Sequence, residues 1–345
     1  MDLNSIDLFS GCGGLSEGMH QAGFKTLLAF EIDKIAVETY RLNHPRTAII
    51  TKDIRRVSIA LVKRILNKKT IHLLAGCPPC QGFSAVRRLN RSKPVQDDRN
   101  DLILQYVRFV KALKPYTLMM ENVSGLVNYD LFEQSINALR RAGYKWIDYK
   151  IVDVKDYGVP QSRKRLVLIG SRLGEIKVAD GSSDRMTVRD MIESLPLPQD
   201  SDDPLHRIFP THTPDVQKRI EITPKNGGSR KDLPKEYLLK CHQNENIGFN
   251  DIYGRLRWDN VSSTITGGCL NPSKGRFLHP EQNRCISARE AALLQSFPMH
   301  YKFPTNIPKD ELALLIGNAL PPKFSFVQSQ NIYKHLKSHL EPSFS

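Results

Sequence analysis

Residues 76–84 have the composition and spacing best suited to chemistry, reading Gly-Cys-Pro-Pro-Cys-Gln-Gly-Phe-Ser. The apolar run 71–75 before them is short enough to be a buried strand of a parallel sheet, and the two prolines end that strand. Cys80 is therefore expected just past the carboxyl end of a strand, the edge where open α/β sheets bind their ligands. A thiol on a rigid turn, followed by a polar loop, favours a nucleophile.

Two other interpretations of these cysteines stay open at this point. Cys77 and Cys80 form a Cys-x-x-Cys pair, which is also typical of a redox couple or of half a zinc site, and either thiol could be structurally inert. Two consecutive prolines are unusual inside a redox pair, and zinc needs a second pair of ligands. The remaining cysteines offer no such spacing; they are Cys12, Cys241, Cys269 and Cys285.

The composition is that of a soluble globular chain. Its 345 residues, 40% hydrophobic and 25% charged, suffice for one large domain or two. No stretch approaches the roughly 18 apolar residues of a membrane span, and the first residues lack the features of a signal peptide. Because scattered cysteines fit a reducing compartment better than a disulfide framework, we expect a cytoplasmic protein.

The formal charge of +14 predicts a polyanionic partner. The charge is unevenly distributed, since residues 173–286 hold 16 Lys and Arg against 16 Asp and Glu. Directly after the Pro-Pro-Cys turn, residues 84–93 carry cations and no acid. This segment is either a solvated loop or, beside a nucleophile, a loop that contacts phosphates.

The elements that must position Cys80 follow an α/β pattern. An apolar strand over 5–9 leads into a glycine turn and a helix over 15–21, the opening of a nucleotide-binding βα unit. A second strand over 26–31 ends at Glu31, about 20 residues after the glycine turn, where such folds keep an acid for ribose hydroxyls. The glycine spacing departs from G-x-G-x-x-G, so a dinucleotide is not the natural ligand.

Two further acids are expected at the same edge. Residues 52–54 could close a third strand and place Asp53 there, although a helix N-cap is the alternative for Asp53. A helix over 101–114 precedes a buried strand over 117–120, which leads directly into Glu121. Acids and the thiol would then gather where parallel strands end.

The rest of the chain completes the predicted fold. Strands over 146–152 and 165–169 form a late hairpin, and the proline-rich stretch 173–286 predicts a loop-rich second domain with short strands. Helices follow over 287–296, which starts at a Ser-x-x-Glu capping box, and over 309–316 and 323–336. The predicted fold class is α/β, with a doubly wound, mostly parallel sheet and a second, smaller domain.

Six ordered segments resemble the motifs of the DNA cytosine-5 methyltransferases of bacterial restriction-modification type. Residues 7–14 are similar to the cofactor loop and residues 76–84 to the Pro-Cys nucleophile loop; the later motifs are 121–123, 161–165, 289–298 and 317–322. The resemblance covers most of the chain outside about 173–255, with Leu320 where valine is commoner. It implies a Rossmann-like, class I S-adenosylmethionine-dependent fold.

The resemblance also implies that the chain has two functional domains. Residues 1–172, completed by 303–345, would form the catalytic and cofactor-binding domain. Residues 173–302 would form the target-recognition domain.

The family's chemistry explains the residue types, because cytosine C5 is too poor a nucleophile to attack a sulfonium methyl group unaided. The resemblance implies that the Cys80 thiolate adds to C6 and that C5 then takes the methyl group, leaving S-adenosylhomocysteine. Glu121 would act at N3, for which it must be protonated or share a proton. Arg165 is implied at the cytosine O2, with Arg163 supporting the glutamate; an ion pair with Arg163 is the structural alternative for Glu121. No metal is needed.

The implied cofactor pocket sets Phe9 against the adenine, Glu31 on the ribose and Asp53 on the adenine amino group. For the aliphatic members, ordinary core packing is the alternative. The full set is Phe9, Gly11, Gly13, Gly14, Glu31, Ile32, Asp53, Ile54, Pro79, Leu102, Asn318 and Leu320.

The implied substrate is double-stranded DNA, from which the target base must be flipped out because its ring face is inaccessible inside the stack. For each candidate contact a solvated charge, a turn-capping serine or an ordinary strand residue is the alternative. The candidate DNA contacts are Gln81, Ser84, Arg87, Arg88, Arg255, Arg257 and Thr264.

The leading hypothesis is therefore a sequence-specific DNA cytosine-5 methyltransferase, a monomer located with the DNA of the nucleoid, with a cognate restriction endonuclease as a possible partner. The first alternative is a tRNA methyltransferase of the same family, whose Cys-Phe-Thr signature is matched by neither Cys241-His242-Gln243 nor Cys269-Leu270-Asn271. The second is an inactive DNA-binding relative, against which the intact Cys80 and Glu121 argue.

Overall fold

The computed structural model describes residues 2–79, 101–238 and 251–341. By packing, the chain divides into two compact units. Unit 1 consists of Met1–Tyr157, Lys164–Ser182 and Leu320–Ser345, and unit 2 of Gly158–Arg163 and Ser183–Ala319.

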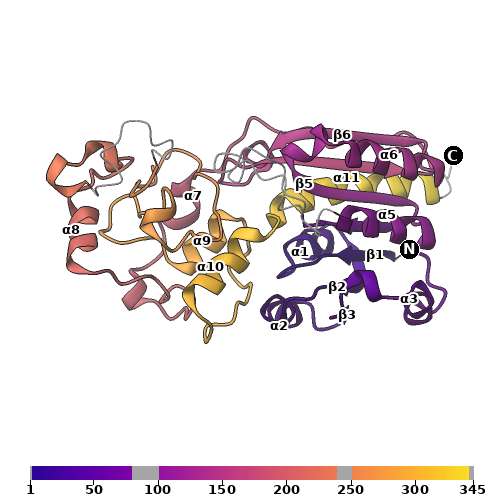
Figure 1. Ribbon diagram of the computed structural model, residues 1–345, viewed down its shortest axis with the longest axis horizontal. Coiled ribbons are helices and arrows are strands. Elements are labelled where there is room, and N and C mark those ends of the chain that lie inside the picture. The colour runs from indigo at the N-terminus through magenta and orange to yellow at the C-terminus, as the bar shows by residue number, and fades with distance from the viewer. Residues whose placement is uncertain (1, 80–100, 239–250, 342–345) are drawn as a thin grey trace. The chain divides into compact units, whose positions relative to one another are not determined.

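Unit 1 is built on a seven-stranded sheet with the order β3-β2-β1-β4-β5-β7-β6 (Figure 1). The first five strands of this order are parallel, whereas β7 runs antiparallel to both β5 and β6. The predicted doubly wound sheet and its late hairpin are thereby confirmed. The strands are β1 (Leu3–Leu8), β2 (Phe24–Phe30), β3 (Ala48–Ile50), β4 (Leu73–Gly76), β5 (Thr117–Val123), β6 (Trp146–Asp153) and β7 (Lys164–Ser171).

Helices connect and cover these strands, because each parallel crossover needs one. Helix α1 packs against the C-terminal helix α11, and α5 packs against both α3 and α6. Gly18 permits the first of these contacts, since a Cβ there would lie 2.4 Å from Ser325 Cβ. The helices of unit 1 are α1 (Gly14–Gln21), α2 (Lys34–Asn43), α3 (Ile59–Leu66), α5 (Leu102–Leu113), α6 (Asp130–Arg141) and α11 (Pro322–Leu340).

Two local predictions for unit 1 need correction. Strand β3 ends at Ile50, and Asp53 instead caps the 3-10 helix Ile54–Arg56 by accepting from the Arg55 amide, so the N-cap alternative is right. Strand β5 continues through Val123, since it pairs with β7 as far as the Val123–Arg165 partners. Glu121 therefore lies inside the strand rather than after it.

Unit 2 is rich in loops, and within its described residues we find isolated β-bridges rather than the short strands that we expected. Turns and side chains satisfy the backbone polar groups of this unit instead of strand ladders. Its helices are α7 (Val188–Ile192), α8 (Pro214–Ile222), α9 (Ala288–Leu294) and α10 (Lys309–Asn318), with short 3-10 turns between them. The predicted capping box at Ser287 and Glu290 starts α9.

Packing assigns residues 303–319 to unit 2, because α10 packs against α9. The functional division predicted above, which joined 303–345 to residues 1–172, differs at this segment and also at 158–163, which pack in unit 2, and at 173–182, which pack in unit 1. It stays a prediction about function rather than a description of packing.

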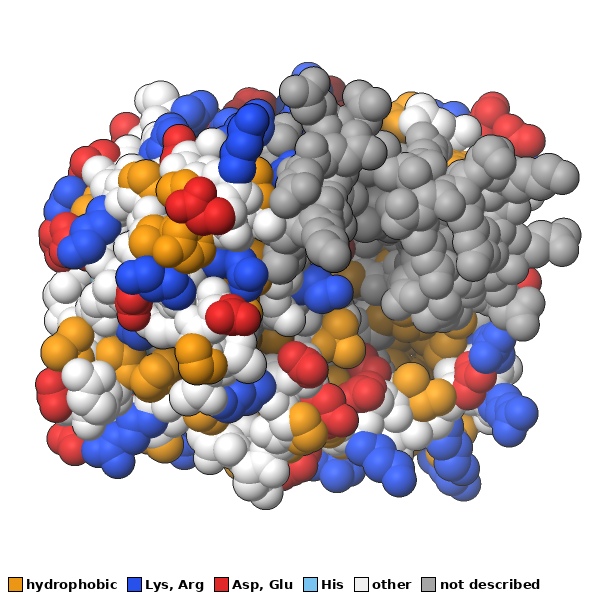
Figure 2. Space-filling view, turned by 60° about the vertical axis from the view of Figure 1, so that its left-hand side comes forward, with side chains coloured by type: hydrophobic (Ala, Val, Ile, Leu, Met, Phe, Trp, Pro, Cys, Tyr) orange, Lys and Arg blue, Asp and Glu red, His pale blue; other side chains and the backbone are white. Residues whose placement is uncertain are grey.

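The surface charges are mixed on the face seen in Figure 2. Lys and Arg side chains alternate there with Asp and Glu over the described residues. No helix among residues 2–79, 101–238 and 251–341 is long and apolar enough to cross a membrane.

Candidate active site

Three neighbouring strands of unit 1 bring the candidate residues to one edge of the sheet. Strands β1, β4 and β5 lie side by side in parallel register, with Leu8 opposite Gly76 and Gly76 opposite Met120. The residues that follow these partners, Phe9, Cys77 and Glu121, therefore occupy the same edge. This is the edge at which such sheets bind ligands.

The glycine turn after β1 forms an open cradle beside β2. Phe9 and Gly11 both have left-handed backbone, with φ values of 62° and 53°. The Gly11 amide donates to Glu31 Oε2 at 2.8 Å, and a Cβ on Gly11 would meet nothing within 4 Å. The space over this turn is thus open, with an acid at its rim.

Glu31 ties this cradle to the end of β2. Its second carboxylate oxygen, Oε1, accepts from the amides of Ile32 and Asp33 at 2.7 and 2.8 Å. The neighbouring Ile32 side chain is 62% exposed, which is unusual for an isoleucine in a folded protein. An exposed apolar side chain, a fixed carboxylate and an open glycine turn fit a nucleoside with a ribose and a flat base.

Asp53 lies at the end of the connection that follows β3. Its carboxylate accepts from Arg55 Nη2 at 2.6 Å, and this hydrogen bond is the main reason why the pKa of Asp53 is lowered. Any ligand amino group at Asp53 must therefore share the carboxylate with the Arg55 guanidinium.

The remaining cofactor candidates divide between cradle and core. Gly13 has a φ of 99° in the turn, and Gly14 begins α1. Ile54 and Leu320 are buried, Leu102 packs against the core of unit 1, and Pro79 is exposed. Asn318 is the last residue of α10 in unit 2.

Glu121 is nearly buried and has a cation beside it. Its Oε1 lies 2.8 Å from Arg165 Nε, so the ion pair of this carboxylate is with Arg165 rather than the expected Arg163. Arg163 belongs to unit 2, where its Nη1 donates to the carbonyls of Ile265 and Gly317, each at 3.0 Å. Strand β7 begins at Lys164, so Arg165 pairs with Val123 at the end of β5, whereas Arg163 precedes the strand.

Cys77 is a site residue to which our sequence analysis gave no role of its own. Burial raises the pKa of its thiol well above the usual value, and the negative charge of the Glu121 carboxylate raises it further. The thiol is therefore protonated at neutral pH, unlike a nucleophile. Its place beside Glu121 follows from the register of β4 and β5, for which the sequence held no local signal.

Asp7 is a second residue that the sequence analysis left without a role. It is fully buried in β1, accepts from Ser16 Oγ at 2.6 Å, and burial raises its pKa to about 8. Ser16 Oγ also lies 2.8 Å from the Tyr40 hydroxyl. An acid within the apolar run Ile6-Asp7-Leu8 was the available signal.

Five of the predicted site residues lie outside the described residues. They are Cys80, Gln81, Ser84, Arg87 and Arg88.

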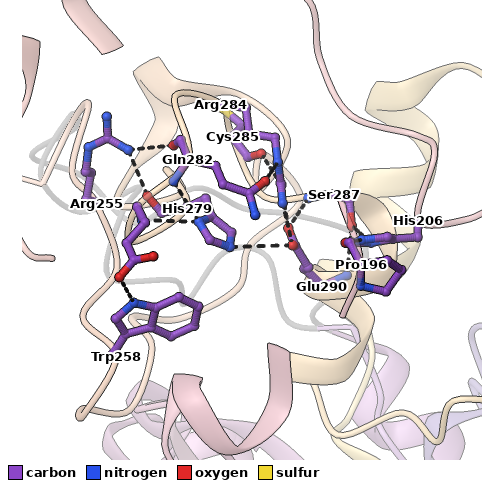
Figure 3. A network of polar contacts seen from close by, with 11 residues as sticks. Pro196, His206, Arg255, Trp258, His279, Gln282, Arg284, Cys285, Ser287 and Glu290 are labelled. Atoms are coloured by element: carbon purple, nitrogen blue, oxygen red, sulfur yellow. Dashed lines mark hydrogen bonds and ion pairs between the residues drawn. The ribbon is translucent and has the colours of Figure 1, made fainter. Parts of the chain in front are cut away.

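Arg255 in unit 2 is a structural residue, and its predicted DNA contact is wrong. It is fully buried, and its guanidinium donates to the carbonyls of Thr223, Ile220, His279 and Gln282 and to Asn283 Oδ1 at 2.6 to 3.0 Å. Figure 3 shows the guanidinium turned toward His279 and Gln282. These bonds occupy all three nitrogens of the guanidinium.

The other two candidate contacts in this part of the chain differ from Arg255. Arg257 is exposed. Thr264 is half-buried and its Oγ1 donates to the Ser162 carbonyl at 2.8 Å, a contact within unit 2.

His279 lies inside the same buried network as Arg255 (Figure 3). Its Nδ1 accepts from the amides of Glu281 and Gln282, and its Nε2 lies 3.9 Å from Glu290, which pairs with Arg284 at 2.7 Å. Burial lowers the pKa of His279 to about 4. The imidazole is therefore neutral in the folded protein at pH values where it would be charged in the unfolded chain.

This shift predicts a loss of stability in acid. His279 imposes no penalty above pH 6.5, and between pH 6.5 and 4 its contribution to the unfolding free energy falls by up to about 3 kcal/mol. We expect a shallower decline in His279→Asn, whose amide oxygen can accept from the same amides, when urea unfolding is measured across this range. Replacement of the exposed His300 by Asn is the control and should keep the wild-type slope; equal slopes in all three proteins would contradict the assignment.

Comparison with known proteins agrees with this geometry. The family model for C-5 cytosine-specific DNA methylases matches residues 3–334. The chain is 33% identical to the type II methylase M.HgiDII of Herpetosiphon aurantiacus, covering 96% of this chain and 95% of that one. It is 34% identical to the type II methyltransferase M1.HphI of Haemophilus parahaemolyticus, covering 97% and 87%.

A solved structure extends the similarity to the whole fold. An Escherichia coli prophage protein, solved as a candidate DNA modification methyltransferase, superimposes with a TM-score of 0.75 at 26% identity, over 97% of this chain and 100% of that one. The family match over residues 3–334 agrees with the sheet edge and its glycine cradle. The chain belongs to the C-5 cytosine-specific DNA methylase family and is an enzyme of the DNA (cytosine-5-)-methyltransferase class.

Proposed function

We propose that this enzyme transfers the methyl group of S-adenosylmethionine to C5 of a cytosine flipped out of a specific double-stranded DNA sequence, through a covalent bond between Cys80 and cytosine C6. One observation carries the proposal most directly. The nearly buried pair Glu121–Arg165 lies at the same sheet edge as the open cradle that Glu31 closes. This placement supports a reaction site in unit 1 that joins an acid and a guanidinium to the proposed cofactor cradle.

Glu121 and Arg165 have the chemistry that the addition step requires. As the Cys80 sulfur bonds to C6, negative charge develops on the ring at N3 and O2. Glu121 holds a proton for N3, and Arg165, which is already 2.8 Å from the carboxylate, donates to O2. After methylation C5 gives its proton to water, N3 returns its proton to Glu121, and the C6–sulfur bond breaks, which returns the thiolate.

The cofactor residues bind and orient rather than react. Glu31 accepts from the ribose hydroxyls, Phe9 and Ile32 pack against the adenine, and Asp53 accepts from its amino group. S-adenosylmethionine, when bound, supplies an electrophilic methyl group. The fit rests on the open Gly11 turn, the fixed Glu31 carboxylate and the exposed Ile32.

The contacts of Glu31 lead to a prediction for cofactor affinity. Replacement of Glu31 by Gln should raise the Kd for S-adenosylmethionine about 10-fold to 100-fold, because a charge-assisted hydrogen bond to the ribose and the tie to the Gly11 amide are both weakened. Isothermal titration with S-adenosylhomocysteine measures this. Glu38→Gln on helix α2 is the matched control, and equal affinities of all three proteins would contradict the role of Glu31.

We assign target recognition to the predicted domain 173–302, with Arg257 and Thr264 as its candidate DNA contacts. Binding of the DNA by this domain would accompany the flipping of the target cytosine out of the duplex. The names of the type II relatives support a cognate restriction endonuclease that shares the same site. The enzyme would act as a monomer.

The proposal is tested by incubating the protein with methyl-labelled S-adenosylmethionine and, separately, mixed-sequence duplex DNA or tRNA. Digestion of the DNA to nucleosides should yield label in 5-methylcytosine, and bisulfite sequencing then gives the recognised site. Label on adenine N6 would contradict the proposal. Transfer to tRNA but not to DNA would support the tRNA alternative instead.

A further inference from the structure

We propose that the sheet edge opposite the candidate active site is a second surface for double-stranded DNA, which binds without regard to sequence and holds a segment other than the one being methylated. The inference rests on the proposed DNA substrate and goes beyond it, since this part of unit 1 takes no part in the reaction. The surface, which we call the basic edge, carries two cations at or just past the C-terminal end of each of α3, α5 and α6. They are Lys68, Lys69, Lys111, Lys114, Arg140 and Arg141.

Short connections bring the three helix ends to one edge of the sheet. Six residues separate α3 from β4, three separate α5 from β5, and four separate α6 from β6. The first residues of these strands are in register, with Leu73 opposite Thr117 and with Ser171 of β7 opposite both Thr117 and Trp146. Helix α5 also packs against both α3 and α6. The six cations therefore form one row beside the starts of β4, β5 and β6.

The positive charge of this row is not balanced within the described part of the chain. All six side chains are exposed. The stretches 54–76, 102–120 and 134–147, to which the six belong, contain no Asp or Glu. Among residues 2–79, 101–238 and 251–341, none of the six takes part in an ion pair. By contrast, the exposed Arg55 and Arg189 each pair with a carboxylate.

Helix dipoles account for only a part of this charge. A helix C-terminus carries a partial charge of about −0.5, which favours a cation nearby. Three such ends therefore balance about one and a half of the six positive charges. The excess favours an external polyanion, since exposed cations without protein partners are those that displace counterions from phosphates.

The dimensions of the row fit the backbone of a duplex. Packed helices lie about 8 to 10 Å apart, so three neighbouring helices spread their cations over about 20 Å. Duplex DNA carries one negative charge per roughly 1.7 Å of its axis, which gives about 12 phosphates over that length. Because the enzyme belongs to a DNA methylase family, DNA is the polyanion that it meets.

A duplex at the basic edge is distinct from the one at the reaction site. Thr117 begins β5 at the basic edge, and Glu121 lies four residues further along the strand, about 13 Å away at 3.3 Å per residue. Duplex DNA has a persistence length of about 150 base pairs, so one short duplex does not bend round the sheet to contact both edges. On long DNA, a segment held at the basic edge raises the concentration of neighbouring sites at the other edge.

The first test measures binding of a duplex made only of A·T pairs, which holds no cytosine to methylate. In a triple variant of the basic edge, log K should depend less steeply on log salt concentration, with a slope smaller by about 2 to 3, because each lost phosphate contact contributes about 0.9. The Kd at about 50 mM salt should rise about 10-fold or more. Fluorescence anisotropy of the labelled duplex measures both. The variant combines Lys68→Gln, Arg140→Gln and Arg141→Gln.

A control variant loses the same charge from exposed positions on other elements of unit 1. It should keep the wild-type slope and a Kd within about 3-fold of the wild type, because these cations lie outside the row. A wild-type slope in the basic-edge variant, or an equal loss in both variants, would overturn the inference. The control combines Arg41→Gln, Arg46→Gln and Lys334→Gln.

Acetylation footprinting separates this inference from the proposed function, because it needs no methyl transfer. The A·T duplex should protect Lys68, Lys69, Lys111 and Lys114 from an amine-reactive reagent, with Lys334 as the unprotected reference, as measured by mass spectrometry. Unchanged acetylation of the four lysines would overturn the inference even if the enzyme methylates DNA. Protection in a protein that does not methylate DNA would retain the basic edge as a DNA surface and reject the proposed function.

Discussion

Replacing Cys80 by alanine is expected to reduce methyl transfer to double-stranded DNA by about four orders of magnitude or more, the scale seen when a covalent nucleophile is removed. Without the sulfur, C6 cannot be attacked and C5 stays too electron-poor to take a methyl group. Single-turnover transfer of labelled methyl groups measures the loss. Affinity for S-adenosylhomocysteine should stay within about 3-fold of the wild type, because the thiol is not needed to bind the nucleoside.

Cys269→Ala is the matched control for this variant, since it removes a cysteine that the mechanism does not use. It should retain the transfer rate to within a factor of about 3. Transfer that survives in Cys80→Ala, or a loss of equal size in Cys269→Ala, would show that the reaction does not depend on the proposed nucleophile.

Replacing Arg255 by methionine is expected to destabilise unit 2 by about 3 to 5 kcal/mol. The substitution keeps much of the side-chain volume but leaves four carbonyls and the Asn283 amide oxygen buried without their donor. Urea unfolding, with hydrogen exchange to locate the change in unit 2, measures this effect.

Arg257, two residues further along, provides the matched control because it is exposed. Arg257→Met should change the unfolding free energy by less than about 0.5 kcal/mol, while weakening DNA binding if its proposed contact exists. A similar loss of stability in both variants would mean that burial of Arg255 does not carry the effect.

The sheet of unit 1 was predictable from sequence because its strands are short apolar runs separated by helices with clear ends. The runs before Phe9 and Glu121 are buried on both faces and the run before Glu31 is buried over its last three residues, so their hydrophobicity identifies them without knowledge of their partners. The acids at or near their carboxyl ends were found for the same reason.

The polar partners were less predictable, because they depend on register between strands far apart in the chain. Arg165 rather than Arg163 pairs with Glu121 since β7 joins β5 antiparallel with Val123 opposite Arg165. Cys77 reaches the same sheet edge as Glu121 through the parallel register of β4 and β5. No local pattern in the sequence encodes either pairing.

Unit 2 was the least predictable part, since side chains there replace regular backbone ladders. Arg255 sits in a sequence that resembles a solvated basic segment, yet its guanidinium satisfies four carbonyls from two separate segments, the end of α8 and the loop that holds His279 and Gln282. Burial of an arginine is rare unless all its donors are paired. The charge of Arg255 therefore suggested an exposed side chain that contacts DNA, whereas the residue is buried.

The central claim is that Cys80 bonds to C6 of an extruded cytosine, and trapping on duplex DNA containing 5-fluorocytosine tests it most directly. Fluorine at C5 cannot leave as the proton does, so the C6–sulfur bond should persist once the methyl group has been transferred. We predict a denaturation-resistant complex of enzyme and DNA that requires S-adenosylmethionine, with the nucleotide mapped to Cys80 by mass spectrometry. Absence of the complex from a protein that methylates ordinary cytosine, or attachment at another residue, would contradict the account.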